Sequence, residues 1–198
     1  GKPDYYQKIY DGRPTDEIKG IEVLYWGGYK DLSNGSDVEM RDNALFFPPV
    51  RAFLVLPFDK LQKVPLSLNL GIIGHEFSHL VFNKRVFAGS SLPGPITQWT
   101  LTPFNLIKSM DEGFADLHGY GVTCTSQGKG PGCLTSFLSS SFDPNKADEK
   151  KIILERDMAD PKQCMTAELR AAIHNFGPAE FLNGGLHYKL GTLIATSL

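Results

Sequence analysis

Residues 66–82 read LSLNLGIIGHEFSHLVF, an apolar stretch that carries two histidines and one glutamate. Its leucines, isoleucines and phenylalanines fall on several sides of a helix, and no proline interrupts them, which predicts a buried central helix. His75 and His79 are four residues apart, so a helix places both side chains on one face, close enough to share one ion. We therefore expect a helix over residues 67–83.

The HEFSH motif within this stretch predicts a metal site. Neutral imidazoles at this spacing suit Zn²⁺, and Glu76 can hold the water that such a metal activates. Short motifs also arise by chance, and the alternative is two ordinary helix histidines beside a solvated glutamate. A third candidate ligand would favour the metal site over ordinary histidines, because a catalytic zinc binds three protein groups and leaves one position open for water.

A second motif, DEGFADLHGY at residues 111–120, offers that third ligand. Glu112 and Asp116 are four residues apart and share one helical face, which suits a metal ligand and a carboxylate behind it. Asp111 is rotated from Glu112 by about 100°, and Asp116 has a shorter side chain, so Glu112 is the better ligand. A solvated acidic face is the alternative, but the apolar residues between these acids argue against it. The expected zinc ligands are His75, His79 and Glu112.

These two motifs resemble those of the thermolysin-like gluzincins, which are zinc peptidases with a His₂Glu site. In that family the HExxH helix is followed by a helix with an NExxSD-type motif, which is matched here by DEGFAD at residues 111–116. The resemblance implies that Asp116 orients a ligand histidine, by analogy His75.

Three further segments occur in the family's order. RDMADP, which begins at Arg156, is similar to the family's RSMSDP segment, and this implies that Arg156 contacts the substrate carbonyl and the ligating glutamate. NGGLHYKLG is similar to NGGVHxNSG, and this implies that its histidine, His187, stabilises the oxyanion of the tetrahedral intermediate. Upstream, Asn43 and Ala44 lie in a DNALF segment similar to the NAFW edge strand, which implies that they pair with the substrate backbone.

The chain also departs from the family pattern. Leu182 occupies the position of an aspartate that orients the oxyanion histidine, and no tyrosine lies between His79 and Glu112, where the family has one that helps to bind the oxyanion. Residues 117–126 contain no acid, so the family's paired Ca²⁺ site looks depleted, and the resemblance implies at most a reduced calcium site.

Length and composition fit a globular enzyme core that is secreted or periplasmic. The 198 residues have a net charge of −2, so there is no basic field that would favour nucleic acid as a partner. No apolar run approaches the roughly 18 residues that a membrane span needs. The chain begins at Gly1 rather than Met, as expected after removal of a signal or propeptide or cleavage of a tag.

The three cysteines are consistent with a secreted or periplasmic location, where disulfides form. Cys124 and Cys133 bracket a Gly/Pro-rich loop that a disulfide can close. Cys164 is then free, buried, or paired with a segment outside this chain.

The order of elements predicts an α+β fold, with strands first and helices after. The expected strands are residues 21–26, 43–47 and 52–56, and the expected helices are residues 67–83, 104–122 and 166–176 and one that starts near His187. The expected loops are residues 89–103 and 123–150. We divide the chain into a β-rich lobe that ends in the HExxH helix, residues 1–84, and a mainly helical or loop lobe, residues 85–198.

The sequence of the last expected helix predicts that another polypeptide segment packs against it. Its apolar residues recur at helical spacing and form a face that would be partly exposed to solvent on a lone surface helix. The residues of this face are Leu190, Leu193, Ile194 and Leu198. Gluzincins continue beyond this point with a helical lobe, whereas the chain ends at Leu198. We therefore expect that lobe to be truncated or supplied by a C-terminal fragment or a second chain. The alternative is a helix that packs wholly on its own core.

The predicted function is that of a zinc-dependent endopeptidase that acts on proteins or peptides. Glu76 would take a proton from the attacking water and deliver it to the leaving amine. The metal, His187 and Arg156 would share the charge on the oxyanion.

There are three alternatives to a gluzincin endopeptidase, one from another functional class and two from other groups of zinc peptidases. A catalytically weak or inactive zinc-stabilised binding module, or a processed subunit of a larger protease, is motivated by Leu182 and the early end of the chain. An aminopeptidase-type gluzincin needs an anchor for the substrate amine, and the sequence shows no such motif. A metzincin is excluded, because Phe82 and Arg85 occupy the positions of its glycine and third histidine.

Overall fold

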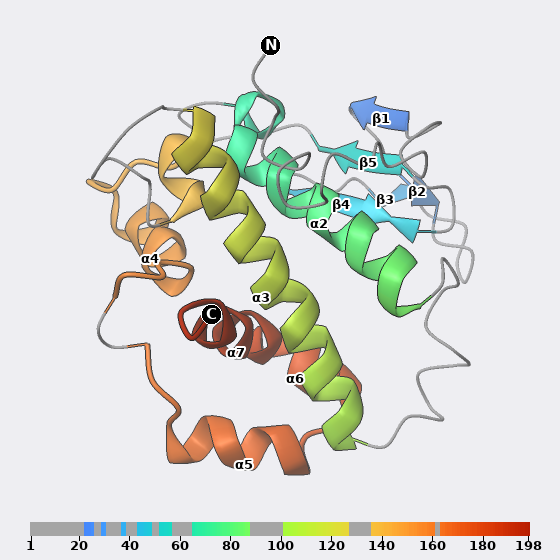
Figure 1. Cartoon of the computed structure of the whole chain (residues 1–198), viewed down its shortest axis with the longest axis vertical. Helices are drawn as coiled ribbons and strands as arrows, with labels where there is room; N and C mark the ends of the chain where they lie inside the picture. Colours follow the sequence, from blue (N-terminus) through green and yellow to red (C-terminus); the bar gives the residue numbers. More distant parts are fainter. Residues whose placement is uncertain are drawn as a thin grey trace.

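The computed structural model shows a mixed α+β fold, in which small β-sheets lie beside a set of helices (Figure 1). The α+β class predicted from the sequence is therefore confirmed. The structure describes residues 22–25, 29–30, 37–38, 43–48, 52–56, 65–87, 101–126, 136–160 and 163–198. Within these ranges, no helix combines the length and the apolar character needed to cross a membrane.

The larger sheet has three strands in the order β1-β5-β4. β1 (Glu22–Tyr25) runs parallel to β5 (Ala52–Val55), and β4 (Ala44–Phe47) runs antiparallel to β5. The three predicted strands are confirmed, each slightly shorter than expected. In the described part of the sheet β4 is an edge strand, and it contacts α2.

A smaller sheet has two antiparallel strands. β2 (Tyr29–Lys30) pairs with β3 (Asp37–Val38). The sequence between them contains Asn34-Gly35, which lies outside the described residues.

α2 (Leu70–Val86) is the buried helix that carries both histidines of the HExxH motif. Asn69 caps it, because its side-chain oxygen accepts hydrogen bonds from the backbone N–H groups of Gly71 at 2.9 Å and Ile72 at 3.2 Å. These bonds satisfy two of the donors that a helix start leaves unpaired. A 3-10 turn, Leu66–Leu68, precedes the cap, so the helix begins later than the predicted residue 67.

α3 (Leu101–Ser126) crosses the middle of the molecule, with α2 on one side and α7 (Leu186–Ala195) on the other (Figure 1). α3 confirms the helix predicted at residues 104–122 and extends it at both ends. α7 confirms the last helix, which was expected to start near His187. These three helices carry the HEFSH and DEGFAD motifs and the histidine of NGGLH.

Glycines bring these helices into close contact. A Cβ atom on Gly119 of α3 would lie 2.8 Å from the carbonyl oxygen of Gly71 in α2. On the other side, a Cβ atom on Gly113 would lie 2.6 Å from the carbonyl oxygen of Gly191 in α7. Both distances are too short for a carbon atom, so any residue other than glycine at these positions would push the helices apart.

Three shorter helices complete the described structure: α4 (Ala147–Glu155), α5 (Ala167–Asn175) and α6 (Pro178–Asn183). α5 confirms the helix predicted at residues 166–176. The loop expected over residues 123–150 is wrong at both ends, because α3 continues to Ser126 and α4 begins at Ala147. α4 is polar on most of its surface and buries Ile153, so its overall composition resembles that of a loop.

Two clusters of buried apolar side chains hold the elements together. The first joins the large sheet, α2, α4 and the 3-10 turn Phe137–Ser140, and consists of Val55, Leu66, Ile72, Phe137, Phe142 and Ile153. The second joins α5, α6 and α7, and consists of Leu169, Ala172, Ile173, Phe181 and Leu190.

The apolar face of the last helix packs within the chain. Leu190 is buried, and Leu193 and Ile194 pack against the second cluster, while Leu198 is 70% exposed. Leu193 and Ile194 are only partly buried, so the chain's own core covers this face in part, and the further polypeptide stays a prediction. The division of the chain into two lobes stays a prediction, and α2 contacts both β4 and α3.

Candidate metal centre

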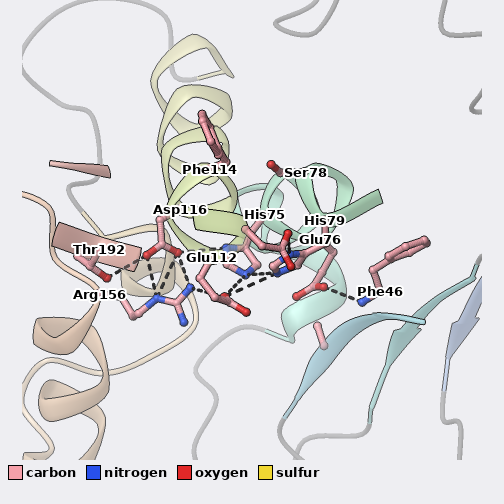
Figure 2. Close-up of polar contacts among 12 residues, drawn as sticks. Phe46, His75, Glu76, Ser78, His79, Glu112, Phe114, Asp116, Arg156 and Thr192 are labelled. Carbon is pink, nitrogen blue, oxygen red and sulfur yellow. Dashed lines mark hydrogen bonds and ion pairs between the residues drawn. The ribbon is translucent and has the colours of Figure 1, made fainter. Parts of the chain in front are cut away.

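Three side chains from two helices converge on one point. His75 and His79 lie one turn apart on α2, and Glu112 reaches them from α3 (Figure 2). His75 Nε2 lies 3.0 Å from His79 Nε2 and 3.5 Å from Glu112 Oε2, and His79 Nε2 lies 3.7 Å from the same oxygen. The structure therefore brings together the three residues that the sequence predicts as metal ligands.

These separations suit a metal ion. In a tetrahedral site with bonds of about 2.0–2.1 Å, geometry sets neighbouring donor atoms about 3.3 Å apart. The observed separations of 3.0, 3.5 and 3.7 Å lie on both sides of that value. His75 and Glu112 are buried and His79 is largely so, which limits competition from bulk water. This group can hold a metal ion with three protein ligands and one position left open.

A carboxylate lies behind the first histidine. His75 Nδ1 is 3.1 Å from Asp116 Oδ1, as the sequence resemblance implies. Asp116 is fully buried, accepts a hydrogen bond from Thr192 Oγ1 at 3.0 Å, and forms an ion pair with the guanidinium of Arg156. Arg156 Nη2 also lies 3.4 Å from Glu112 Oε2 (Figure 2). One arginine thus balances both the ligand carboxylate and the carboxylate behind the ligand.

A second carboxylate lies behind the other histidine, and sequence reasoning missed it. Asp111 Oδ1 is 2.8 Å from His79 Nδ1, and Asp111 Oδ2 accepts a hydrogen bond from Lys108 Nζ at 2.8 Å. The rotation that made Asp111 unsuitable as a ligand directs it to the outer nitrogen of His79. The sequence did contain a signal, because Asp111 and Glu112 are adjacent: one acid can bind a metal while the other contacts a ligand histidine.

The electrostatics favour a cation between these groups. Burial alone would lower the pKa of His75, but the carboxylates of Asp116 and Glu112 outweigh it and raise that pKa to about 9. Burial alone would raise the pKa of Glu112, but His79, His75 and Arg156 hold it well below its usual range. The carboxylates therefore stay ionised at neutral pH, and the imidazoles attract either a proton or a metal ion.

Glu76 lies beside the three donors on the side of the sheet. Its Oε2 accepts a hydrogen bond of 2.7 Å from the backbone N–H of Phe46 in β4 (Figure 2). Burial raises the pKa of Glu76 above its usual value, against the pull of both nearby histidines. A buried carboxylate of this kind, next to a metal site but outside its ligand set, suits a proton acceptor.

The centre lies in the wall of a cavity of about 550 Å³. The candidate ligands, Glu76 and Arg156 form a polar part of its lining. The apolar part is formed by Leu66, Ile72, Phe137, Leu138, Phe142 and Ile152. The predicted substrate-binding residues Asn43 and Ala44 also line it, at the start of β4. The cavity thus lies between the edge strand β4 and the candidate metal centre.

His187 and Tyr188 follow one another at the start of α7 but lie in different surroundings. His187 is buried, and this burial lowers its pKa to about 4. It is not among the described residues that line the cavity, whereas Tyr188 is. The role predicted for His187 stays a prediction, and no pattern in the sequence indicated that Tyr188 lines the cavity.

The structure bears on one of the cysteine predictions. Cys164 is free and exposed. Cys133 lies outside the described residues, so the Cys124–Cys133 disulfide stays a prediction.

Comparison of the chain with models of known protein families finds no match, and neither do comparisons with curated proteins and with solved structures. The resemblance to gluzincins therefore rests on the sequence motifs, and membership of that family stays a prediction.

Proposed function

We propose that the chain is a zinc-dependent endopeptidase in which His75, His79 and Glu112 hold the metal. The observation that carries the proposal is the convergence of these donors in the wall of a cavity that also exposes Glu76. Two imidazoles and a carboxylate suit Zn²⁺, although other divalent metals accept the same donors. When bound, zinc supplies a Lewis acid that lowers the pKa of water and polarises a carbonyl group.

Glu76 is the general base in this proposal. The oxygen of a water molecule forms a bond to the peptide carbonyl carbon, and Glu76 takes the proton that the water loses. The C–N bond then breaks, and Glu76 delivers the proton to the leaving nitrogen. One water is consumed for each peptide bond, and Glu76 returns to its ionised state.

The surrounding residues hold these groups in place. Asp111 accepts a hydrogen bond from the outer nitrogen of His79, and Asp116 Oδ1 lies 3.1 Å from the outer nitrogen of His75, so the two carboxylates orient the rings. Arg156 fixes Asp116 and Glu112. Support for a peptide substrate comes from β4, an edge strand in the described sheet that borders the cavity, because an extended peptide can pair with such an edge.

Hydrolysis of an unfolded protein, with zinc and with a chelator, tests the proposal. The decisive variant is Glu76→Gln, which removes the proton acceptor and leaves the metal donors in place. We expect it to retain stoichiometric zinc while turnover falls by at least ~10²-fold. Glu180→Gln, an exposed substitution on α6, is the matched control and should behave like the unchanged protein. Near-normal turnover by Glu76→Gln would contradict the assigned base.

A zinc-stabilised module with little activity is the second candidate. It is favoured by Leu182, which gives His187 no carboxylate partner, and by the position of His187 outside the described cavity lining. This candidate predicts stoichiometric zinc and metal-dependent stability in a protein that cleaves no peptide bond.

A further inference from the structure

α7 presents His187 and Tyr188 in succession, and the helix separates their directions by about 100°. Thr192 lies one turn after Tyr188, and its hydroxyl donates a hydrogen bond of 3.0 Å to Asp116 Oδ2. Tyr188 therefore shares the face of α7 that is turned toward Asp116. Gly191 lies one turn after His187 and packs against the backbone of α3. The helix thus places His187 toward the packed interior and Tyr188 toward the cavity.

The ring of Tyr188 is held at the edge of the metal centre. The guanidinium carbon of Arg156 lies 4.5 Å from the ring centroid, which is a cation–π contact. The same guanidinium lies 3.4 Å from Glu112 Oε2, so one side chain separates the phenol ring from a metal donor. Tyr188 is 39% exposed, which leaves it accessible to a ligand in the cavity.

The phenol can donate a hydrogen bond at neutral pH. Although part of the residue is exposed, partial burial and the nearby carboxylate of Glu112 raise the pKa of Tyr188 to about 12, so the hydroxyl keeps its proton. His187 differs, because its Nδ1 is buried and has no hydrogen-bond partner among the described residues.

We infer that the Tyr188 hydroxyl donates a hydrogen bond to the reacting carbonyl oxygen of a peptide substrate. The inference rests on the proposed peptidase function and names a residue that contacts the reacting atoms. No proton is transferred in this contact. The hydrogen bond strengthens as the oxygen gains negative charge during attack by water, and it weakens again when the C–N bond breaks and the carbonyl forms anew.

Tyr188→Phe tests this, because it removes the hydroxyl and keeps the ring against Arg156. Tyr120→Phe is the matched control, since it removes the same atom from an α3 side chain that is not among the described cavity-lining residues. In the zinc-loaded protein, we expect Tyr188→Phe to lower kcat on a peptide by roughly 10²–10³-fold, with KM and zinc content unchanged. Tyr120→Phe should match the unchanged protein.

A second measurement is independent of turnover. A phosphonamidate peptide mimics the tetrahedral, anionic state, and calorimetry of the zinc-loaded protein measures its affinity. Tyr188→Phe should weaken this binding at least ~10-fold and leave the affinity for the uncleaved peptide, measured on the Glu76→Gln background, unchanged.

The outcomes separate the inference from the proposed function. If the unchanged protein is active and Tyr188→Phe matches Tyr120→Phe in both measurements, the inference is overturned and the peptidase function stands. A loss of zinc or of thermal stability in Tyr188→Phe would also overturn it, because Tyr188 would then be structural. If His187→Gln lowers kcat and Tyr188→Phe does not, the donor is His187. If the zinc-loaded unchanged protein neither cleaves peptides nor binds the phosphonamidate, both ideas fail.

Discussion

Each histidine of the metal centre has a carboxylate behind it, and each carboxylate has a cation of its own. Asp116 contacts His75 and Arg156, and Asp111 contacts His79 and Lys108. Such partners would fix which nitrogen faces a bound metal and would make the imidazoles stronger donors. If these histidines hold zinc as proposed, its affinity would therefore depend at the scale of single residues on side chains that do not touch the metal.

Asp111→Ala measures this dependence. His79 would lose the acceptor that fixes its ring, so we expect zinc affinity to fall by roughly 10–100-fold. Asp148→Ala, at an exposed position in the first turn of α4, is the control and should leave zinc affinity unchanged. Competition with a chromophoric chelator gives both values. Equal affinities in the two variants would show that Asp111 does not support the metal.

The metal-free protein should lose stability as the pH rises. The pKa of His75 is about 9 in the folded protein against an ordinary value of 6.5, because the carboxylates of Asp116 and Glu112 outweigh the opposite effect of burial. Protonated His75 therefore stabilises the fold fully below pH 6.5, and this contribution disappears as the pH rises through 9. We expect the free energy of unfolding to fall by on the order of 3 kcal/mol over this range.

Urea unfolding at several pH values measures this loss, and His75→Gln should largely remove it. An equally steep loss in His75→Gln would assign the effect to another group. Zinc affinity should change in the opposite direction, because zinc binds the neutral imidazole and its affinity rises with pH.

At this scale the sequence predicted the donors but not all of their partners. His75, His79 and Glu112 could be found because spacing along a helix decides which side chains share a face. Asp111 and Tyr188 could not, because their contacts depend on how α3 is rotated against α2 and how α7 is rotated against α3. Spacing along one helix does not specify that rotation.

At the scale of elements, the glycine contacts fix how closely the helices approach. Gly113 follows the ligand Glu112 directly and touches Gly191 of α7. A longer side chain at either position would separate α7 from α3, and with it Thr192 from Asp116. The packing of α7 therefore contributes to the position of the candidate metal ligand Glu112 on α3.

Gly113→Ala tests this link. The added Cβ would lie 2.6 Å from the Gly191 carbonyl oxygen, so the helices must move, and we expect a loss of about 1–3 kcal/mol in stability together with weaker zinc binding. Gly177→Ala is the control, because a Cβ there has no described neighbour within 4 Å. Thermal unfolding and zinc titration of both variants decide the matter. Normal zinc affinity in Gly113→Ala would separate the glycine contact from the metal site.

The elements themselves were predicted unevenly. α2 and α3 were predicted because long apolar stretches mark buried helices. α4 was missed because most of its residues are charged, and its helical character depends on Ile153 packing into a core built by distant segments. α6 was missed because six residues are too few for a periodic pattern.

At the scale of the whole molecule, the metal centre joins the two helices that each lead to a different core. α2 packs with the sheet in the first cluster, and α3 packs with α5, α6 and α7. Because the candidate ligands lie on both helices, metal binding would constrain how these parts are held together.

Removal of zinc should therefore loosen the whole fold and not only the site. At a free zinc concentration about 100 times the Kd, binding adds about 2.7 kcal/mol to stability, so a chelator should lower Tm by several degrees. Glu112→Ala should show the lower Tm without chelator. If chelator leaves the Tm of the unchanged protein as it was, the metal does not couple the helices.

The hydrogen bond from the Phe46 N–H to Glu76 has a consequence for spectroscopy. This amide proton points at the carboxylate that exchanges a proton in each proposed turnover, so its NMR frequency depends on the charge of that carboxylate. The Phe46 resonance follows the ionisation of Glu76 during a pH titration, without substrate and without a label in the cavity. In Glu76→Gln the same resonance loses its pH dependence. A single backbone signal thus reports the charge state of the general base in the resting protein.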